Sequence, residues 1–375
     1  MHKAITILYT TCYLDVSGVT RINFDILSRL SSAADIHICT TGNDGKISCL
    51  WDDRFVSAFR QPFKLWSLPS RTRYGAFVKY LQSNNIDIIF VTHSLWLYEH
   101  VARLKRDLPS IRVVDSLHVL EPYCFRGGYP DISANRFVHP FIDASILISR
   151  NIESYLLKNY HVSRNKLHVI HNGIDTVLFN SCSIISNTLK TSILPTVTAK
   201  TLGFIGRFTE QKRPLFFVRI ACDLIARNPD LGFYMVGCGP LSDEVSKEIK
   251  RHGLEEKIML LSSQSNVALL LHETDVLLLP SSYEGAPLTI LEALAAGTPV
   301  VASDVGAIRE YVGDLCRLIP LGGADVRERQ QYVMAVNECL AEGRNSGVLK
   351  PEHDITAVAA SYKSVFYKVA GLERP

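Results

Sequence analysis

The chain has 375 residues, of which 47% are hydrophobic and 21% are charged, and its formal net charge is +3. This balance is ordinary for a soluble globular protein and excludes a disordered chain. Because the net charge is close to neutral, nothing in it indicates a nucleic-acid partner. The length is large for one core and predicts two domains.

The cysteines and the apolar segments indicate in which cellular compartment the protein is expected. The nine cysteines form no C-x-x-C pair, and their odd number favours reduced cytosolic thiols over a disulfide framework or a zinc site. Met1 leads into an apolar stretch, residues 4–9, that is too short for a secretion signal. No stretch reaches the roughly 18 apolar residues of a membrane-spanning helix. We therefore expect a cytoplasmic protein that is soluble or peripheral to a membrane.

Short apolar strands alternate with amphipathic helices along the whole chain. In the first half, the predicted strands are residues 4–9, 35–40, 87–92, 112–117 and 145–149. In the second half, they are residues 201–205, 232–236, 257–261, 275–279 and 299–303. This alternation is typical of parallel sheets covered by helices on both faces, so the predicted fold class is α/β.

A polar segment rich in serine and threonine, residues 181–200, separates the two sets of strands. It has no clear period and predicts a linker. The predicted domains are therefore residues 1–180 and 201–352. A last segment, residues 353–375, contains a predicted helix from Ile355 to Ala370.

The segment from Ser282 to Gly297 places two glutamates eight positions apart across the start of a predicted helix. A buried strand is predicted just before it, from Asp275 to Pro280. This order puts Glu284 in a loop and Glu292 on the second helical turn. The local prediction is therefore strand, loop and helix, with one carboxylate on each of the last two.

The ends of this helix carry residues that favour its boundaries. Pro287 suits the first helical turn, and Gly297 suits the left-handed position after the last turn. An anion binds well where the amides at a helix start point outward, which here are those of Gly285, Ala286 and Leu288. These groups predict a pocket for a phosphorylated ligand rich in hydroxyls. The alternative is an ordinary helix start with a surface glutamate further along.

A second motif follows the predicted strand 201–205. Gly206 makes a turn, and Arg207 and Lys212 then lie five positions apart before the next helix. The planar fork of arginine and the compact charge of lysine suit a diphosphate. Taken alone, two cations at this spacing favour a solvated basic loop over a binding site.

A third motif, with Gly237 and Gly239, follows the strand 232–236. It superficially suggests a dinucleotide-binding turn, but Ser242 stands where the third glycine of that fingerprint is required. The serine therefore disfavours an NAD-dependent dehydrogenase.

Together, the E-x7-E segment and the Gly-Arg…Lys element resemble those of retaining glycosyltransferases of family 4. That resemblance implies two Rossmann-like domains facing across a cleft, the GT-B fold, and a C-terminal helix that crosses back to the N-terminal domain. It implies that Glu284 contacts the donor sugar and that Glu292 hydrogen-bonds the nucleotide ribose. It also implies that Arg207 and Lys212 neutralise the departing nucleotide, which is electrostatic catalysis.

The same resemblance implies that the glycine turns lie close to the donor. Gly206, Gly237 and Gly239 would then approach the nucleotide, together with the backbone at the helix start, which is formed by Gly285, Ala286 and Leu288. A related turn contains Gly306, which the family often follows with a second glycine. Here Ala307 follows, and packing of the turn is as good an explanation as contact with a ligand.

In the N-terminal half, three residues are candidates. Ser17 and Gly18 stand where the family often has two glycines, and the resemblance implies approach to the acceptor at Ser17 and to the donor phosphate at Gly18. His118 ends the strand 112–117, and a histidine at this place in the family points into the cleft near the sugar. A structural strand-end histidine is the alternative for His118, and a simple turn is the alternative for Gly18.

Metal ligands are not evident in the sequence. It contains no Asp-x-Asp, so the metal-bridged diphosphate of the other large glycosyltransferase fold has no obvious ligands here. Clustered His, Cys and Asp spacings are also missing. We expect no cofactor, with the nucleotide-diphosphate sugar as co-substrate and with catalysis that needs no divalent cation.

Residues 54–79 mix cations with aromatic side chains, and residues 1–180 carry 20 Lys and Arg against 15 Asp and Glu. One interpretation is a peripheral contact with an anionic inner membrane, or with a lipid-diphosphate acceptor. The other is a buried aromatic helix with solvated arginines. The periodicity does not decide between them.

The sequence thus predicts a retaining, metal-independent glycosyltransferase that moves a sugar from a nucleotide-diphosphate donor to a glycan or lipid-linked glycan. Bacterial surface-polysaccharide synthesis is the pathway that we expect. A sugar-nucleotide epimerase on the same plan is one alternative, although it would need further acid and base groups near the sugar. A non-catalytic sugar-nucleotide binder is another, although it need not keep all of Arg207, Lys212, Glu284 and Glu292.

Overall fold

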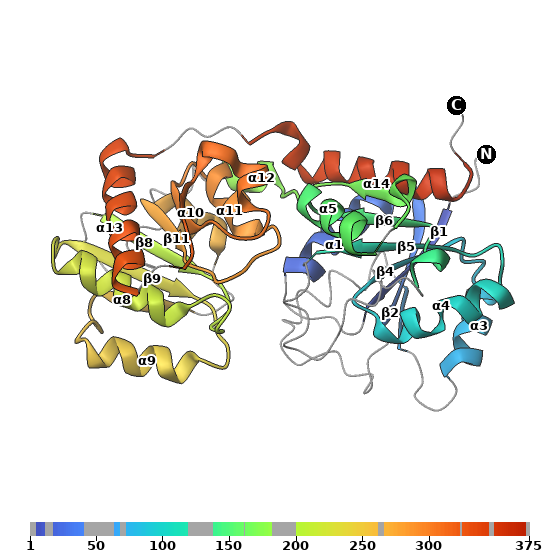
Figure 1. Cartoon of the computed structure of the whole chain (residues 1–375), viewed down its shortest axis with the longest axis horizontal. Helices are drawn as coiled ribbons and strands as arrows, with labels where there is room; N and C mark the ends of the chain where they lie inside the picture. The colour runs from blue at the N-terminus through green and yellow to red at the C-terminus, as the bar shows by residue number, and fades with distance from the viewer. Residues whose placement is uncertain are drawn as a thin grey trace. The chain divides into compact units, whose positions relative to one another are not determined.

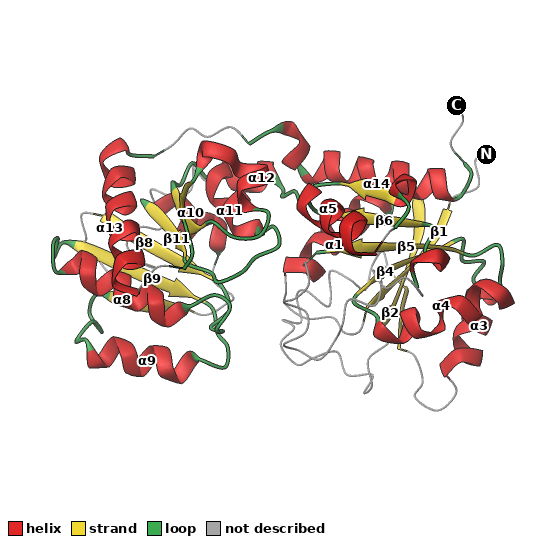
Figure 2. Ribbon diagram, viewed as in Figure 1, coloured by secondary structure: helices red, strands yellow, loops and turns green. Residues whose placement is uncertain are grey.

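The computed structural model describes residues 5–11, 18–40, 64–67, 73–118, 138–160, 162–181, 200–261, 266–322, 325–344 and 349–372. The chain divides into two compact units, unit 1 with residues 1–173 and 354–375, and unit 2 with residues 174–353. Each unit contains one parallel sheet with helices on both of its faces (Figure 2). The predicted α/β class with two parallel sheets is therefore confirmed.

In unit 1, the described strands form a seven-stranded sheet with the order β3-β2-β1-β4-β5-β6-β7. The chain first moves from β1 outward to β3, and it then returns to add β4 on the other side of β1. The elements are β1 (Ile5–Thr11), α1 (Gly18–Leu30), β2 (Ala34–Thr40), β3 (Lys64–Ser67), α3 (Arg73–Ser83), β4 (Ile88–Thr92), α4 (Leu95–Asp107), β5 (Arg112–Leu117), β6 (Ala144–Leu147), α5 (Arg150–Tyr160) and β7 (Leu167–Val169).

The C-terminal helix α14 (Ile355–Val369) belongs to unit 1 and packs beside α1. Two of its aromatic rings lie on the central strand β4, since the ring centroids of Tyr362 and Phe366 are 5.9 and 5.3 Å from that of Phe90. All three side chains are buried. The predicted return of the C-terminal helix to the N-terminal domain is confirmed (Figure 1).

In unit 2, the described strands form a six-stranded sheet with the order β10-β9-β8-β11-β12-β13. Helices α8, α9 and α13 pack together, and α10 packs against α11. The elements are α6 (Thr176–Ser181), β8 (Lys200–Ile205), α8 (Pro214–Ile225), β9 (Leu231–Val236), α9 (Ser242–Arg251), β10 (Ile258–Leu261), α10 (Val267–Glu273), β11 (Val276–Leu279), α11 (Leu288–Ala295), β12 (Val300–Ser303), α12 (Ile308–Val312), β13 (Arg317–Ile319) and α13 (Asp325–Glu342).

The ten predicted strands are all present, with ends that agree within two residues, but β3, β7 and β13 are not predicted. Each of these three lies at the edge of its sheet and has only three or four residues. Interior strands of a parallel sheet are buried on both faces and therefore show continuous apolar runs. These three edge strands pair on one side only and carry no such run, whereas the edge strand β10 is apolar throughout and was predicted.

Candidate active site

The sheet of unit 2 has a topological switch point between β8 and β11. From β8 the chain moves to β9 and β10 on one side, and it then crosses to β11 on the other side of β8. In open parallel sheets, ligands bind beyond the carboxyl ends of the strands at such a point. The loops that follow β8 and β11 carry Arg207 and Lys212 on one and Glu284 on the other, so the fold brings these predicted residues to one edge.

Lys212 and Glu284 meet directly at the switch point. The Lys212 Nζ donates to Glu284 Oε1 at 2.5 Å, and the two side chains are only 15% and 5% exposed. Arg207 lies in the same β8–α8 loop and is exposed. The edge therefore presents one exposed guanidinium beside a nearly buried ion pair.

The loops after β8 and β11 are also joined through their backbones. The Ser282 N–H donates to the Gln211 carbonyl oxygen at 2.8 Å, and the Gln211 Nε2 donates to the Tyr283 carbonyl oxygen at 3.0 Å. Lys212 and Glu284 are thus carried by two segments that hold each other. Gln211 was not among the predicted site residues, because a single glutamine in a loop carries no sequence signal.

The helix that bears Glu292 begins one residue later than predicted. Pro287 is the N-cap residue, with ψ at 121°, and α11 starts at Leu288. The proline ring fixes φ but not ψ, so Pro287 can precede the helix as well as begin it. Gly285 and Ala286 lie in the loop before it. Glu292 is 2% exposed on the second turn, and the helix ends as predicted, with Gly297 at a φ of 75°.

Gly306 supports the Glu284 loop from the β12–α12 turn. Its φ is 62°, and a Cβ there would overlap the Glu284 carbonyl oxygen. Next to it, the Ala307 N–H donates to the Gly285 carbonyl oxygen at 3.1 Å. Of the two explanations for this turn, the structure favours packing, and it shows that the packing partner is the loop that carries Glu284.

Gly237 and Gly239 pack against the β8–α8 loop. A Cβ on Gly237, whose φ is 148°, would overlap the carbonyl oxygen of Gly206. A Cβ on Gly239 would likewise overlap the carbonyl oxygen of Phe208, at 2.5 Å. The Ser242 Oγ accepts from the Gly239 N–H at 3.0 Å. The two glycines therefore allow the β9–α9 loop to pack directly on the β8–α8 loop, and Ser242 closes the turn that contains Gly239.

In unit 1, His118 is buried at the end of β5, with 3% exposure. Its Nε2 is 2.9 Å from the Ser116 Oγ, which is 3.2 Å from the Tyr362 hydroxyl on α14. Burial lowers the pKa of His118 to about 3, with a smaller contribution from His93. The imidazole is therefore neutral at ordinary pH.

His93 is a candidate that sequence reasoning missed. It follows β4 at the switch point between β1 and β4, it is exposed, and its backbone is left-handed with a φ of 52°. Its ring centroid lies 6.4 Å from that of His118. Its position directly after the predicted strand 87–92 could have identified it from the sequence, since ligand-binding side chains gather at such strand ends.

The remaining residues predicted for unit 1 lie only partly within the described residues. Gly18 is the exposed first residue of α1, whereas Ser17 lies outside the described residues. Within residues 54–79, the described parts are the edge strand β3 and the start of α3, where Phe77 is fully buried and Lys79 is exposed. At these two positions the cation, and not the aromatic ring, faces solvent.

Two family models match consecutive parts of the chain. Residues 16–178 match the model described as Glycosyltransferase Family 4, and residues 199–341 match the one described as Glycosyl transferases group 1. The chain belongs to glycosyltransferase family 4. The GT-B fold of this family 4 member is also that of solved neighbours, such as Anabaena HepE in complex with UDP-glucose, with a TM-score of 0.71 and 17% identity over 98% of each chain.

Curated relatives of this family 4 member differ in how much of it they match. N-acetyl-alpha-D-glucosaminyl L-malate synthase of Bacillus anthracis is 24% identical over 96% of both chains. The UDP-Gal:alpha-D-GlcNAc-diphosphoundecaprenol alpha-1,3-galactosyltransferase of Escherichia coli is 33% identical over 40% of this chain and 39% of its own. For several other curated relatives, the chain spans 39% to 61% of their length.

Two observations on the family 4 chain concern its surroundings. Among its described helices, none combines the length and the apolar character that crossing a membrane requires. The described cysteines, which are Cys39, Cys222, Cys238, Cys316 and Cys339, are free thiols.

Proposed function

We propose that this chain is a retaining glycosyltransferase that moves a sugar from a nucleotide-diphosphate donor to a glycan or lipid-linked glycan acceptor. The single observation that carries the proposal is the meeting of Lys212 and Glu284 at the switch point, with Arg207 in the same loop. An exposed guanidinium beside a nearly buried ion pair suits a diphosphate attached to a sugar.

In the reaction that we propose, the bond between the anomeric carbon and the phosphate oxygen breaks. The acceptor hydroxyl oxygen bonds that carbon on the same face, and its proton passes to the departing diphosphate. Arg207 and Lys212 stabilise the negative charge that develops on the leaving group. Glu284 orients the sugar, and Glu292 holds the ribose.

No divalent cation is part of the proposal, because the two cations take the place that a metal would have at the diphosphate. His118 lines the acceptor side as a neutral imidazole, since burial lowers its pKa to about 3. It can therefore donate or accept a hydrogen bond near neutral pH without carrying charge. A neutral, buried histidine is a poor acid–base catalyst at that pH, which disfavours the epimerase alternative.

The biological setting that we propose is bacterial surface-polysaccharide synthesis at the cytoplasmic face of the inner membrane. Relatives named for lipopolysaccharide core mannosyl transfer and for galactosyl transfer to a diphosphoundecaprenol support it. A lipid-linked acceptor would bring the enzyme to the membrane surface, where the cations of residues 54–79 would meet anionic lipid.

The first test is titration of the purified chain with UDP-, GDP-, ADP- and dTDP-sugars, with and without EDTA. We expect the Kd for the sugars of one nucleotide to be well below the Kd for the others, and we expect EDTA to leave that Kd unchanged. Failure of every donor to bind would overturn the proposed donor site, and loss of binding in EDTA would overturn the metal-independent mechanism.

Variants then separate the two glutamates. We expect Glu292→Gln to weaken binding of the free nucleotide roughly tenfold to a hundredfold, which is the effect of one hydrogen bond to a charged group. Glu284→Gln should leave that Kd near wild type and slow sugar transfer by about a hundredfold. Glu255→Gln, at an exposed glutamate of the same unit, is the matched control. Wild-type behaviour of both variants would contradict the assignment.

A further inference from the structure

The residue after Lys212 has an uncommon backbone conformation. Arg213 has φ 52° and ψ 52° and stands at the N-cap of α8 without a side-chain capping bond. Left-handed geometry is unfavourable for a residue with a side chain, and it persists where the surroundings impose it. Here the Arg213 N–H donates to the Thr209 carbonyl oxygen at 3.2 Å, and the guanidinium group makes further contacts.

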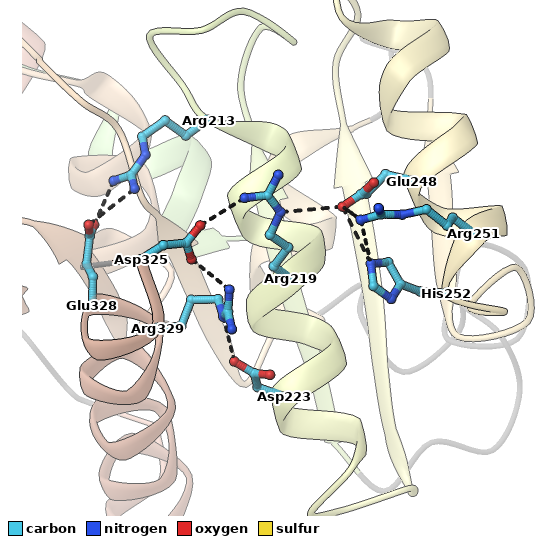
Figure 3. Close-up of polar contacts among 9 residues, drawn as sticks. All are labelled: Arg213, Arg219, Asp223, Glu248, Arg251, His252, Asp325, Glu328 and Arg329. Carbon is cyan, nitrogen blue, oxygen red and sulfur yellow. Dashed lines mark hydrogen bonds and ion pairs between the residues drawn. The ribbon is translucent and has the colours of Figure 1, made fainter. Parts of the chain in front are cut away.

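Figure 3 shows that this guanidinium faces Glu328 on α13. The two nitrogens donate to the two carboxylate oxygens at 2.6 and 3.2 Å. The side chains are 21% and 5% exposed, and the Arg213 Cζ lies 3.9 Å from the centroid of the Phe216 ring. A paired fork over an aromatic face is geometry that arginine provides and lysine does not.

The same guanidinium also reaches the loop that carries Glu284. The Arg213 Nη1 donates to the Pro280 carbonyl oxygen at 3.3 Å, directly after β11. Arg213 is therefore fixed to the segment of Lys212 by the chain, and to the segment of Glu284 by a hydrogen bond. Its own position is fixed by Glu328.

Helix α13 supports a third loop at this edge. Four residues after Glu328, the hydroxyl of Tyr332 lies 2.9 Å from the Ser303 Oγ at the end of β12. Ser303 precedes the turn in which Gly306 packs on the Glu284 backbone. Helix α13 thus contacts the β8–α8 loop at Arg213 and the β12–α12 loop at Ser303, and it is connected to the Glu284 loop through Arg213.

We propose that Arg213 and Glu328 are positioning residues, which set the geometry of the Lys212–Glu284 ion pair without touching the donor. The proposal rests on the proposed function for the part that this ion pair plays in transfer. Loss of the Arg213–Glu328 contact leaves the charges of Lys212 and Glu284 unchanged and lets their two loops move apart.

The test compares Glu328→Gln and Arg213→Lys with a control on the same helix. Arg329 lies on the same helix as Glu328 and donates at 2.7 Å to both Asp223 and Asp325 (Figure 3). These contacts are with helices and not with the β8–α8 and β11–α11 loops, so Arg329→Gln removes a comparable ion pair and leaves the loops alone.

The first readout is amide hydrogen exchange of residues 206–213 and 280–288 in the ligand-free protein. We expect Glu328→Gln and Arg213→Lys to speed exchange in both segments roughly tenfold, because local opening becomes easier. Arg329→Gln should leave both segments at wild-type rates. Unchanged exchange in the first two variants would overturn the proposal, whether or not any nucleotide binds.

The second readout is transfer kinetics with the nucleotide-sugar selected by titration. Since misplacement of catalytic groups lowers the rate of the chemical step, we expect kcat to fall roughly tenfold or more, with KM for the donor changed less. We expect Arg329→Gln to lower Tm as much as Glu328→Gln and Arg213→Lys do, but to keep the wild-type kcat. Equal kcat in all three variants would overturn the positioning role.

A charge exchange separates positioning from stability. Arg213→Glu combined with Glu328→Arg restores opposite charges, but a carboxylate at 213 cannot donate to the Pro280 carbonyl oxygen. We expect this double variant to recover Tm and not to recover loop protection or kcat. Recovery of all three would show that the pair only stabilises the fold. A wild-type chain that binds no nucleotide would defeat the proposed function and leave the exchange result to decide the positioning role.

Discussion

At the scale of single residues, the main feature is an ion pair that is nearly closed to water. Removing either Lys212 or Glu284 would leave the other charge almost buried and unpaired, which is costly. The low local dielectric also strengthens the effect of the cation on any diphosphate that binds at this edge. Function at the site therefore depends on how closely the surrounding backbone can pack.

Gly306 offers a direct test of that packing. In Gly306→Ala, a Cβ must displace the Glu284 carbonyl oxygen, in addition to the cost of a left-handed φ. Gly253→Ala is the matched control, because Gly253 has a φ of 65° and open space around it. We expect a loss of roughly 1 kcal/mol from φ in both variants, and about 1–3 kcal/mol more in Gly306→Ala from overpacking.

The measurement is urea unfolding followed by far-UV circular dichroism, together with transfer activity. Gly253→Ala should keep wild-type activity, and Gly306→Ala should lose most of it because Glu284 is displaced. If both variants lost the same stability and kept their activity, Gly306 would be a turn residue with no part in holding the loop.

At the scale of elements, one arginine binds the C-terminal ends of the two helices α10 and α11. Arg344 donates to the carbonyl oxygens of His272 and Thr274 at 2.7 and 2.9 Å, and to that of Ala296 at 2.6 Å. These carbonyls close α10 and α11, where a helix has acceptors without partners inside the helix. A cation there also complements the helix dipole.

We expect Arg344→Met to lower the free energy of unfolding by roughly 2–3 kcal/mol, since three backbone acceptors, two of them on the buried residues Thr274 and Ala296, lose a charged donor. Arg317→Met is the control. Its guanidinium pairs with Glu342 and Glu338, whose side chains are more than half exposed, so its loss should cost under about 1 kcal/mol. Similar unfolding curves for both variants would show that Arg344 adds nothing beyond a surface contact.

At the scale of the whole molecule, unit 1 is made of two distant parts of the chain. Residues 1–173 need α14, from residues 354–375, to cover Phe90 and to supply the Tyr362 hydroxyl near Ser116. Unit 1 can therefore reach its complete packing only after the rest of the chain has been made.

The stability of unit 1 should fall in mild acid because of its buried histidines. Burial lowers the pKa of His118 to about 3 and that of His139 to about 4, with smaller contributions from His93 and Lys166. Below the ordinary pKa near 6.5, the unfolded chain binds protons that the folded chain does not. The stability is therefore complete above about pH 6.5 and is lost as the pH falls, by up to about 1.4 kcal/mol per pH unit for each histidine.

Tryptophan fluorescence can measure this in unit 1 alone, because the three tryptophans of the chain, Trp51, Trp66 and Trp96, all lie in it. We expect urea unfolding between about pH 7 and pH 5 to show a shallower pH dependence in His118→Gln than in wild type. His252→Gln, at the C-cap of α9 in unit 2, is the control and should keep the wild-type slope. An unchanged slope in His118→Gln would show that His118 titrates normally in the folded state.

The sequence by itself determined the fold class, the interior strands and the two glutamates around a helix start. These features are local, because a strand buried on both faces shows an apolar run and a helix end shows its cap within a few residues. The β8–α8 loop was predicted in the same way. The edge strands β3, β7 and β13 left no such record.

Only the tertiary structure decided which of these residues meet. Lys212 pairs with Glu284 across 72 positions and Arg213 with Glu328 across 115, and no periodicity connects residues that far apart. The switch point in strand order selects the loops that become neighbours. Backbone packing, as at Gly237 on Gly206, then fixes how near they come, because that distance depends on how the whole sheet assembles rather than on any single segment.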